Sequence, residues 1–453
     1  MLNYIWIGFL LIGFLVAVFK AIFLSGQQEA LVAMVNNVLQ ASAGTLAPLG
    51  AKNISAAAPP EVFATMLNGI FDAAKTGFEI SLGLAGVMTL WLGIMKIGER
   101  AGVISFVAKG VAPLFRVLFK GVPPGHPAYG SITMNLSANM LGLGNAATPL
   151  GLNAMTELQE LNPTKERATD AQIMFLVLNT AGITLVPSSV IAIRQAIAVQ
   201  QGVKGFNAAD IFLPTLIATF IAFVMGMIIV AIVQRINLLR LPVLIFIAIF
   251  GGIIALLFWY VQHLLATGHT TRQVSDTVGA IGSGFILSLV MLFVAAGAIR
   301  KQKVYEHFIE GAKEGFNVAL RIIPYLIGML IAISVFRTSG CMDFIVAGLA
   351  KAVAAVGLPT DWTPVLPVML MKPLSGSGAQ GLMVDVMRTS GVTSFPAKLA
   401  AILQGTTETT FYVLAVYFGS VGVKNTRNAL ALGLIADLAG MIAAIILGYV
   451  FFH

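Results

Sequence analysis

The chain has 453 residues, of which 58% are hydrophobic and only 10% are charged, and its mean hydropathy is +0.92. Soluble domains carry about 25% charged residues, so this composition excludes a water-soluble globular protein and predicts one that crosses a membrane many times. The formal net charge of +8 does not indicate a nucleic-acid partner, because the cations lie at the ends of apolar runs, as topology signals do. A single cysteine, Cys341, excludes a disulfide framework and a cysteine-rich metal site.

The first apolar run, residues 2–24, is predicted to be a retained membrane helix, because it is too long for a cleaved signal and lacks a basic start. A mildly polar loop over residues 25–70 follows, with Lys52 as its only cation, which is typical of a non-cytoplasmic segment. A second membrane helix is predicted over residues 71–95. The cluster of cations that begins at Lys96 indicates that this helix ends in the cytoplasm.

The rest of the chain predicts seven more membrane helices and two broken, glycine-rich stretches. The helices are expected over residues 171–193, 211–233, 241–261, 278–299, 322–336, 399–418 and 429–451, and the broken stretches over residues 125–155 and 364–391. The sequence therefore predicts an all-α polytopic membrane protein with about nine transmembrane helices.

The two halves of the chain are related by an internal repeat. A shift of 238 residues places Gly77 on Gly315 and Gly102 on Gly340 without a gap, and a shift of 225 aligns the third predicted helix with the eighth. Glycines in register over such a distance favour a duplicated unit over chance. The repeat divides the sequence into an N-terminal helix and loop (1–70), a first repeat (71–195), linking helices (196–300) and a second repeat (301–453).

The cations predict that the two repeats are inverted in the membrane. The first repeat begins beside a cation-poor loop, whereas the second begins in the basic stretch 300–321. All basic loops stay cytoplasmic only if each broken stretch enters and leaves on the same side, as a re-entrant hairpin. Inverted repeats with interrupted hydrophobic segments indicate a secondary transporter with its site at mid-membrane. The residues placed in the cytoplasm include Lys109, Arg235, Lys301 and Lys424.

Glu408 is the first candidate functional residue, because it lies in the polar run 404–410 inside the eighth predicted helix. A carboxylate at a helix centre costs roughly 2.5–3.5 kcal/mol to insert and usually faces a bundle interior or a wet cavity. Glu408 is therefore expected to bind solute or to couple transport to a sodium ion or proton. Alternatively, it pairs with a buried cation for structure alone. Asp437 is the second candidate for ion coupling, with a position at the membrane interface as its alternative.

Small and polar residues of the broken stretches and of the third and eighth helices complete the predicted site. Gly142 and Gly144 would let the first stretch turn, and Gly376 and Gly378 the second, where free amides could bind an anion. The alternative is that these glycines only pack helices together. The predicted solute-binding residues are Asn135, Ser137, Asn139, Asn145, Thr148, Asn179, Thr180, Ser375, Ser377, Gln404, Thr407 and Glu408.

These motifs resemble those of a known family. Residues 71–195, with the run NLSANMLGLGNAATPLG from Asn135, are similar to spore maturation protein A. Residues 309–440 are similar to spore maturation protein B, with PLSGSG from Pro373, QGTTETTFY from Gln404 and GLIAD from Gly433. The whole chain resembles a natural fusion of the two, although its long loop 25–70 is short in the typical A protein. The resemblance implies a nucleoside-recognition gate domain, a distant relation to concentrative nucleoside transporters, a bacterial inner membrane and, in spore formers, a part in dehydrating the spore core.

The sequence thus predicts an inner-membrane secondary transporter or permease for a small polar solute, nucleoside-like or another metabolite, bound between the two hairpins. Membrane lipid is the other expected partner, and homo-oligomer formation stays open. Apart from a coupling sodium ion or proton, no cofactor or metal is expected. The alternative is a non-transporting membrane scaffold for envelope or spore-core maturation. No enzyme activity is expected, because Glu408 has no obvious second catalytic partner in the sequence.

Overall fold

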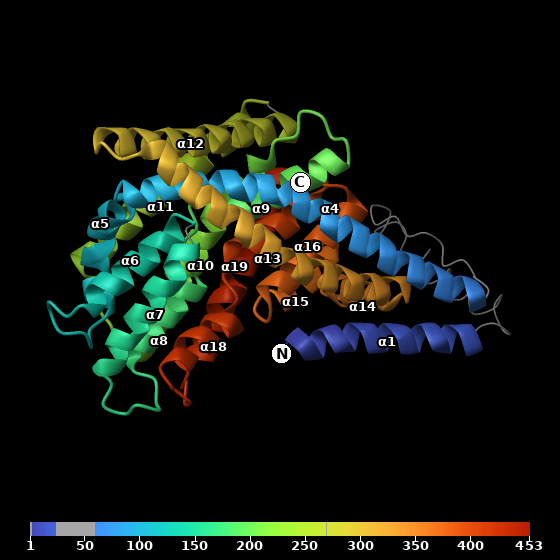
Figure 1. Ribbon diagram of the computed structural model, residues 1–453, viewed down its shortest axis with the longest axis horizontal. Helices are drawn as coiled ribbons and strands as arrows, with labels where there is room; N and C mark the ends of the chain where they lie inside the picture. The colour runs from blue at the N-terminus through green and yellow to red at the C-terminus, as the bar shows by residue number, and fades with distance from the viewer. Residues whose placement is uncertain (1, 24–58, 143, 269) are drawn as a thin grey trace. The chain divides into compact units, whose positions relative to one another are not determined.

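The computed structural model describes residues 2–23, 59–142, 144–268 and 270–453, and within these ranges the chain is helical, as predicted (Figure 1). Most of the predicted loop 25–70 lies outside the described residues. The helices of the first half are α1 (Leu2–Phe23), α4 (Pro59–Arg100), α5 (Val103–Leu118), α6 (Ala128–Met140), α7 (Gly144–Glu160), α8 (Asp170–Thr180), α9 (Ser188–Gln200), η2 (Ala208–Ile211) and α10 (Phe212–Gln234). Those of the second half are α11 (Leu241–Ala266), α12 (Thr271–Ile299), α13 (Val304–Thr338), α14 (Cys341–Ala355), η3 (Thr363–Val365), α15 (Leu366–Met371), α16 (Gly376–Ser390), α17 (Phe395–Thr406), α18 (Thr410–Ser420) and α19 (Ala429–Phe452).

In the described part of the chain, seven helices are long and apolar enough to cross a membrane: α1, α4, α10 together with η2, α11, α12, α13 and α19. They coincide with seven of the nine predicted crossings. The third and eighth predicted helices are instead each divided in two, α8 from α9 by residues 181–187 and α17 from α18 by residues 407–409. The chain is therefore a helical membrane protein, and the count of nine crossings stays a prediction.

Two helices are much longer than the sequence pattern predicted. α4 begins at Pro59 rather than at residue 71, since proline is tolerated in the first turn of a helix, where no backbone donor is needed. α13 begins at Val304 rather than at residue 322. Two carboxylates of its charged first half form ion pairs with Lys96 of α4, which stabilise this half as a helix. The Lys96 ammonium lies 3.2 Å from the Glu314 carboxylate and 3.6 Å from that of Glu310.

The described chain forms two compact units, and each draws segments from both predicted repeats. Unit 1 comprises residues 1–85, 196–204 and 318–400, and unit 2 comprises residues 86–195, 205–317 and 401–453. The first half of α4 and the second half of α13 thus belong to unit 1, and their other halves to unit 2. The four segments predicted from the sequence (1–70, 71–195, 196–300 and 301–453) therefore do not coincide with these two units.

The predicted repeat is visible in the helix boundaries. α4 ends at Arg100 and α13 at Thr338, which differ by the same 238 positions as the repeat. Each is followed by a glycine with positive φ, Gly102 at 71° and Gly340 at 85°, and then by a shorter helix, α5 or α14. A left-handed residue costs little only when it is glycine, so the same sharp turn is encoded in both repeats.

The close contacts between α4 and α13 repeat as well. In unit 1, a Cβ atom on Gly77 would lie 3.1 Å from the Cα atom of Ile327. In unit 2, a Cβ atom on Gly315 would lie 2.9 Å from the Cα atom of Thr89. Since a shift of 238 relates Gly77 to Gly315 and Thr89 to Ile327, the two units make the same contact with the roles of the repeats exchanged. This reciprocity supports duplication of one ancestral helix arrangement.

Unit 1 is assembled on the second half of α13, along which α1 packs. The indole Nε1 of Trp6 donates to the Gly328 carbonyl at 2.8 Å. The ring of Phe9 stacks on Phe336 with centroids 4.6 Å apart. The ammonium group of Lys20 donates to the Ser339 carbonyl, which satisfies a carbonyl at the end of α13.

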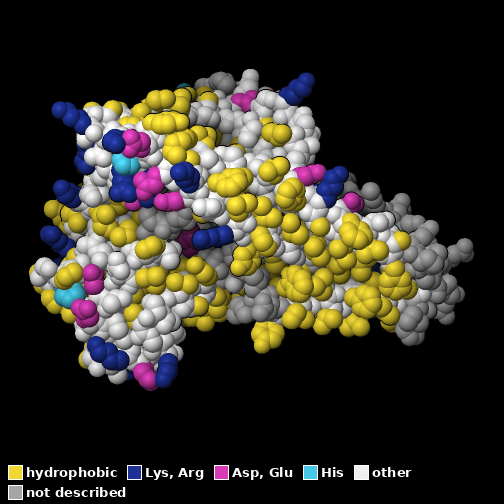
Figure 2. Space-filling view, viewed as in Figure 1, with side chains coloured by type: hydrophobic (Ala, Val, Ile, Leu, Met, Phe, Trp, Pro, Cys, Tyr) yellow, Lys and Arg dark blue, Asp and Glu magenta, His cyan; other side chains and the backbone are white. Residues whose placement is uncertain are grey.

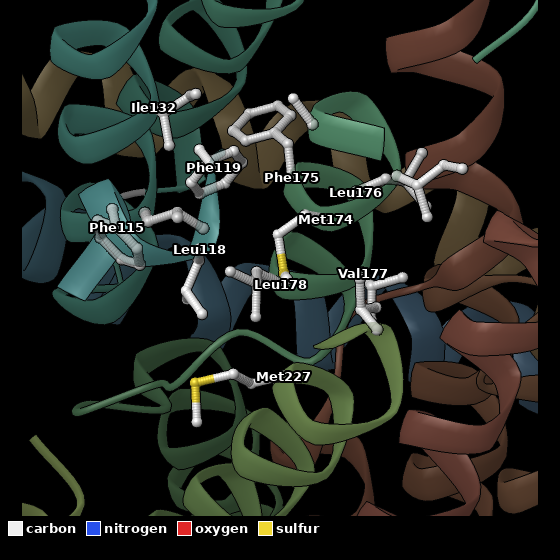
Figure 3. Close-up of a cluster of buried hydrophobic side chains, with 14 of the residues drawn as sticks. Phe115, Leu118, Phe119, Ile132, Met174, Phe175, Leu176, Val177, Leu178 and Met227 are labelled. Carbon is white, nitrogen blue, oxygen red and sulfur yellow. The ribbon is translucent and has the colours of Figure 1, made fainter. Parts of the chain in front are cut away.

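The core of unit 2 is built around α8, whose residues from Ala171 to Thr180 are all buried. Phe175 and Met174 lie among Phe115 and Phe119 of the α5 segment and Met227 of α10 (Figure 3). A helix buried on every side is expected to be largely apolar, and in α8 the buried polar residues are Gln172 near its start and Asn179 and Thr180 at its end. These polar residues are therefore held in the interior by the packing of the rest of the helix.

Some helices leave most of their surface uncovered by protein. In the described chain, only 11% of the membrane-length window of α11 is buried and 22% of that of α12. Figure 2 shows hydrophobic side chains over much of the visible surface, with charged side chains gathered in a few places. A surface of this kind matches the hydrocarbon of a bilayer rather than water.

The contact between α4 and α13 in unit 2 generates the first prediction. A Cβ atom on Gly311 would overlap the Leu92 carbonyl oxygen and lie 2.5 Å from Lys96 Cβ. Gly311→Ala should therefore lower the stability of the purified protein by about 1–3 kcal/mol, measured by thermal unfolding in detergent. Gly110→Ala is the control, because nothing lies within 4 Å of that position in α5 and alanine is the better helix former. Equal melting temperatures for the two variants would contradict the close approach.

Candidate functional site

The candidate site lies in unit 2, where the two broken helices meet. α8 stops at Thr180, and α17 stops at Thr406, with three residues between it and the start of α18 at Thr410. The backbone N–H of Glu408, within the second break, donates to the Thr180 carbonyl at 2.8 Å. Since the last carbonyls of a helix have no partner inside it, this hydrogen bond satisfies one end of α8 and joins the two breaks.

The turn between α6 and α7 lies against the first break. Gly142 adopts a φ of 75° in this turn, and a Cβ atom there would lie 2.8 Å from the Val186 carbonyl oxygen. The backbone N–H of Leu185 donates to the Met140 carbonyl at 2.8 Å. Only glycine fits both the backbone angle and the space, which agrees with the turn predicted at Gly142. The predicted stretch 125–155 is therefore a helical hairpin, and its re-entry into the membrane stays a prediction.

Small residues of α19 let the second break approach closely. A Cβ atom on Gly440 would lie 2.9 Å from the Thr406 side chain, and one on Gly433 would lie 3.0 Å from the Thr410 side chain. Between these glycines, on the same helical face, the buried carboxylate of Asp437 accepts a hydrogen bond from the Thr410 hydroxyl. Asp437 is thus tied to the start of α18.

Two asparagines link the hairpin to α8. The side-chain amide of Asn139 donates to the Asn179 side chain at 2.8 Å, and Asn179 in turn donates to the Phe175 carbonyl at 2.8 Å. Asn135, one turn earlier in α6, donates to the Ala147 carbonyl at 2.7 Å and lies 3.4 Å from the Tyr417 hydroxyl. Buried side-chain amides normally form hydrogen bonds. These asparagines therefore connect α6 to α7, α8 and α18.

Four buried polar atoms around the breaks have no hydrogen-bond partner among the described residues. They are Asn135 Oδ1, Ser137 Oγ, Thr180 Oγ1 and Thr407 Oγ1. A buried polar atom without a partner costs about 1–3 kcal/mol, so natural proteins rarely keep several of them close to one structural feature. Their hydrogen-bonding capacity is not used within the described chain.

Glu408 is placed differently from the sequence expectation. We expected it within a continuous helix over residues 399–418, whereas it lies in the break, between the buried residues Thr407 and Thr409. Its side chain is exposed, and within the described chain no ion pair is formed by it. The run of β-branched threonines weakens the helix locally, and the hydrogen bond to Thr180 stabilises the open backbone.

The remaining predicted residues are distributed as follows. Ser375 is the N-cap of α16 and accepts from the Gly378 N–H at 3.1 Å, and the hydroxyl of Ser377 lies 3.4 Å away. These two serines, Gly376 and Gly378 belong to unit 1, so a solute position between the two hairpins stays a prediction. Within unit 2, Thr148 and Gln404 are half-buried. Gly144 and Asn145 begin α7, and the side chain of Asn145 lies outside the described ones.

Sequence reasoning missed two contributors, Tyr417 and Thr410. A Cβ atom on Gly151 would overlap the ring and hydroxyl of Tyr417, so this tyrosine fills the space beside α7. Thr410 and Tyr417 are seven positions apart on α18, which puts them on one helical face. This spacing was a signal in the sequence.

Comparison with known proteins places the candidate residues other than Asp437 in recognised segments. A family model described as Gate, nucleoside recognition, matches residues 81–196 and 319–424. Spore maturation protein B of Bacillus subtilis (strain 168) is 47% identical over 165 residues, which are 36% of this chain and 91% of that protein. Spore maturation protein A of the same organism is 42% identical over 153 residues, which are 34% of this chain and 75% of that protein. No solved structure matches the chain significantly.

The asparagine link generates the second prediction. Asn139→Ala and Asn179→Ala should each destabilise the protein, and the double variant should lose about 1 kcal/mol less than their sum, because one hydrogen bond joins the two side chains. Reversible unfolding of the four proteins in detergent measures this coupling. Asn139→Ala combined with Thr277→Ala of α12 is the additive control. A coupling energy near zero for the asparagine pair would refute the link.

Proposed function

Because this chain belongs to the family of spore maturation proteins A and B and matches a nucleoside-recognition model in both repeats, we propose that it is an inner-membrane transporter or permease for a small polar solute. Nucleosides are the first substrate class to test. The observation that carries the proposal is the set of unsatisfied buried polar atoms beside two broken helices in unit 2. Interrupted helices are tolerated at membrane depth where they line a cavity or are buried in protein.

The chemistry of the site suits an uncharged polar solute. Asn135 Oδ1 can accept a hydrogen bond, and the hydroxyls of Ser137, Thr180 and Thr407 can both donate and accept. The hydroxyls of a ribose and the edge of a nucleobase offer the complementary groups. A scaffold that binds no solute would gain nothing from leaving these atoms unsatisfied, which favours transport over the scaffold alternative.

Glu408 is the residue that we assign to ion coupling. Its carboxylate is exposed, while its own backbone joins the two breaks through Thr180. A proton or sodium ion at this carboxylate would change the charge beside the hinge-like break without removing a structural ion pair. In this proposal, Asp437 acts through its hydrogen bond to Thr410, at the start of α18.

A two-step experiment tests the proposed function. Purified protein is heated with each member of a nucleoside panel, since a ligand that binds only the folded state raises the apparent melting temperature. Each stabilising compound is then offered as a radiolabelled solute to proteoliposomes. Stabilisation followed by uptake supports transport. Folded protein that neither responds to the panel nor carries a broader set of polar metabolites would favour the scaffold.

The unsatisfied hydroxyls generate the third prediction. Thr180→Val and Thr407→Val keep the side-chain shape but remove a hydroxyl without a partner, so stability should be unchanged or raised by about 1 kcal/mol. Affinity for the transported solute should fall about tenfold, measured by the ligand-dependent thermal shift. Thr219→Val is the control, because that buried hydroxyl already donates to the Leu216 carbonyl at 2.9 Å. Unchanged affinity in both site variants would exclude these hydroxyls from binding.

Glu408 generates the fourth prediction. Glu408→Gln should leave the melting temperature nearly unchanged, since no ion pair of this carboxylate exists in the described chain, but net accumulation of solute should lose its dependence on pH or sodium. Uptake into proteoliposomes with and without each ion gradient measures the effect. Glu160→Gln, an exposed carboxylate at the end of α7, should retain the ion dependence. If Glu408→Gln still accumulates solute with wild-type ion dependence, Glu408 does not couple transport to the ion.

A further inference from the structure

Unit 2 contains an open pocket of about 470 Å³ beside the start of α8, lined by none of the residues of the two breaks. It lies where the loop between α7 and α8 meets the loop between α18 and α19. Its volume is within the usual range for a small ligand or a lipid headgroup. The pocket is lined by Gly121, Leu158, Leu161, Asn162, Pro163, Thr164, Arg167, Ala168, Thr169, Asp170, Ala171 and Arg427.

Hydrogen bonds between the two loops preform this pocket. The backbone N–H of Ala168 donates to the Asn425 carbonyl at 2.9 Å, and those of Lys424 and Asn425 both donate to the Glu166 carbonyl at 2.9 Å. The side chain of Asn162 donates to the Arg167 carbonyl at 2.9 Å. Because the walls are held by backbone bonds, the pocket does not have to be ordered by its ligand.

The pocket lies at the level where two membrane-length helices end. Gln234, the last residue of α10, donates its side-chain N–H to the Asp170 carbonyl at 2.8 Å. Arg427 stands two residues before the start of α19. The ends of membrane helices lie in the headgroup region of a bilayer, so the pocket is expected there too.

The charges of the pocket favour an anion. Arg427 donates to Asp170 at 2.6 Å and to the Ala168 carbonyl at 3.2 Å, which orients its guanidinium. Arg167 is exposed, and no ion pair of its side chain is found in the described chain. The loops around it, residues 116–121, 157–170, 234–240 and 421–428, carry eight cations against four anions.

We propose that this pocket binds a phosphate group, as an anionic membrane lipid presents in its headgroup. A guanidinium donates two parallel N–H groups that match phosphate oxygens, and Arg167 has this fork available. Leu158 and Leu161 form an apolar wall suited to the glycerol and first acyl carbons of a lipid. Basic pockets between membrane helices are a recurrent mode of anionic lipid recognition.

The test titrates the full chain in neutral detergent with phosphatidylglycerol, phosphatidylcholine or sodium phosphate and follows the melting temperature. Phosphatidylglycerol should stabilise the wild type, and phosphatidylcholine should not. Arg167→Gln should require about tenfold more phosphatidylglycerol for the same shift. The control is Arg240→Gln, which removes an exposed arginine from the neighbouring turn but not from the pocket and should match the wild type.

The outcomes separate a built site from general surface charge. Stabilisation by millimolar sodium phosphate that is lost in Arg167→Gln would assign the pocket to free phosphate, whereas a response to the lipid alone assigns it to a headgroup. Equal responses of Arg167→Gln and wild type, or equal losses in Arg167→Gln and Arg240→Gln, would overturn the proposal. If Arg167→Gln fails to fold, Arg427→Lys keeps the charge but removes the guanidinium fork, and an unchanged lipid response in that variant would likewise overturn it.

Discussion

The hydrogen bond from the Glu408 N–H to the Thr180 carbonyl is the constraint on which unit 2 depends. A helix interrupted in an apolar environment leaves backbone groups that water cannot satisfy, so two interrupted helices are stable only when their free ends meet each other or other polar groups. The bond satisfies this requirement for α8. Gly433 and Gly440 of α19 lie opposite the second break, where a larger side chain would collide with the side chains of Thr410 and Thr406.

The hairpin and the two breaks carry four buried polar atoms that have no hydrogen-bond partner in the described chain, and unit 2 holds others at Glu157, Arg194 and Asn428. The rest of unit 2 is a tightly packed apolar core around Phe175, in which α8 is buried on every side (Figure 3). At the two breaks, the hydroxyls of Thr180 and Thr407 have no hydrogen-bond partner among the described residues. Sites where buried polar groups lack hydrogen-bond partners are commonly functional. This is the physical basis of the transport proposal. The exposed carboxylate of Glu408 adds a titratable group at the same place without a structural ion pair in the described chain.

The duplication has a different physical role from the site. Gly77 and Gly315 bring α4 and α13 into backbone contact in unit 1 and unit 2 respectively, with the repeats exchanged. These contacts are made by glycines against backbone, and in unit 2 they are flanked by the ion pairs of Lys96 with Glu310 and Glu314. The basic loops at the ends of α10 and α19 form a third feature, which contains the proposed headgroup site. The helix packing contacts, the proposed solute site and the proposed headgroup site thus involve separate groups of residues.

The sequence alone determined the helical membrane class, seven helices of membrane-crossing length, the repeat and the family, because hydropathy runs and glycine register are local properties of the chain. It also placed the turn at Gly142, since a positive φ leaves few choices of residue. Only the tertiary structure decided that residues 399–418 are not one helix, because the break is stabilised by a hydrogen bond to Thr180, 228 positions before Glu408. The same holds for the roles of Asn179, Tyr417 and Asp437, whose partners lie on other helices, and for the grouping of unit 2, since no local pattern encodes which distant polar atoms meet or stay unsatisfied.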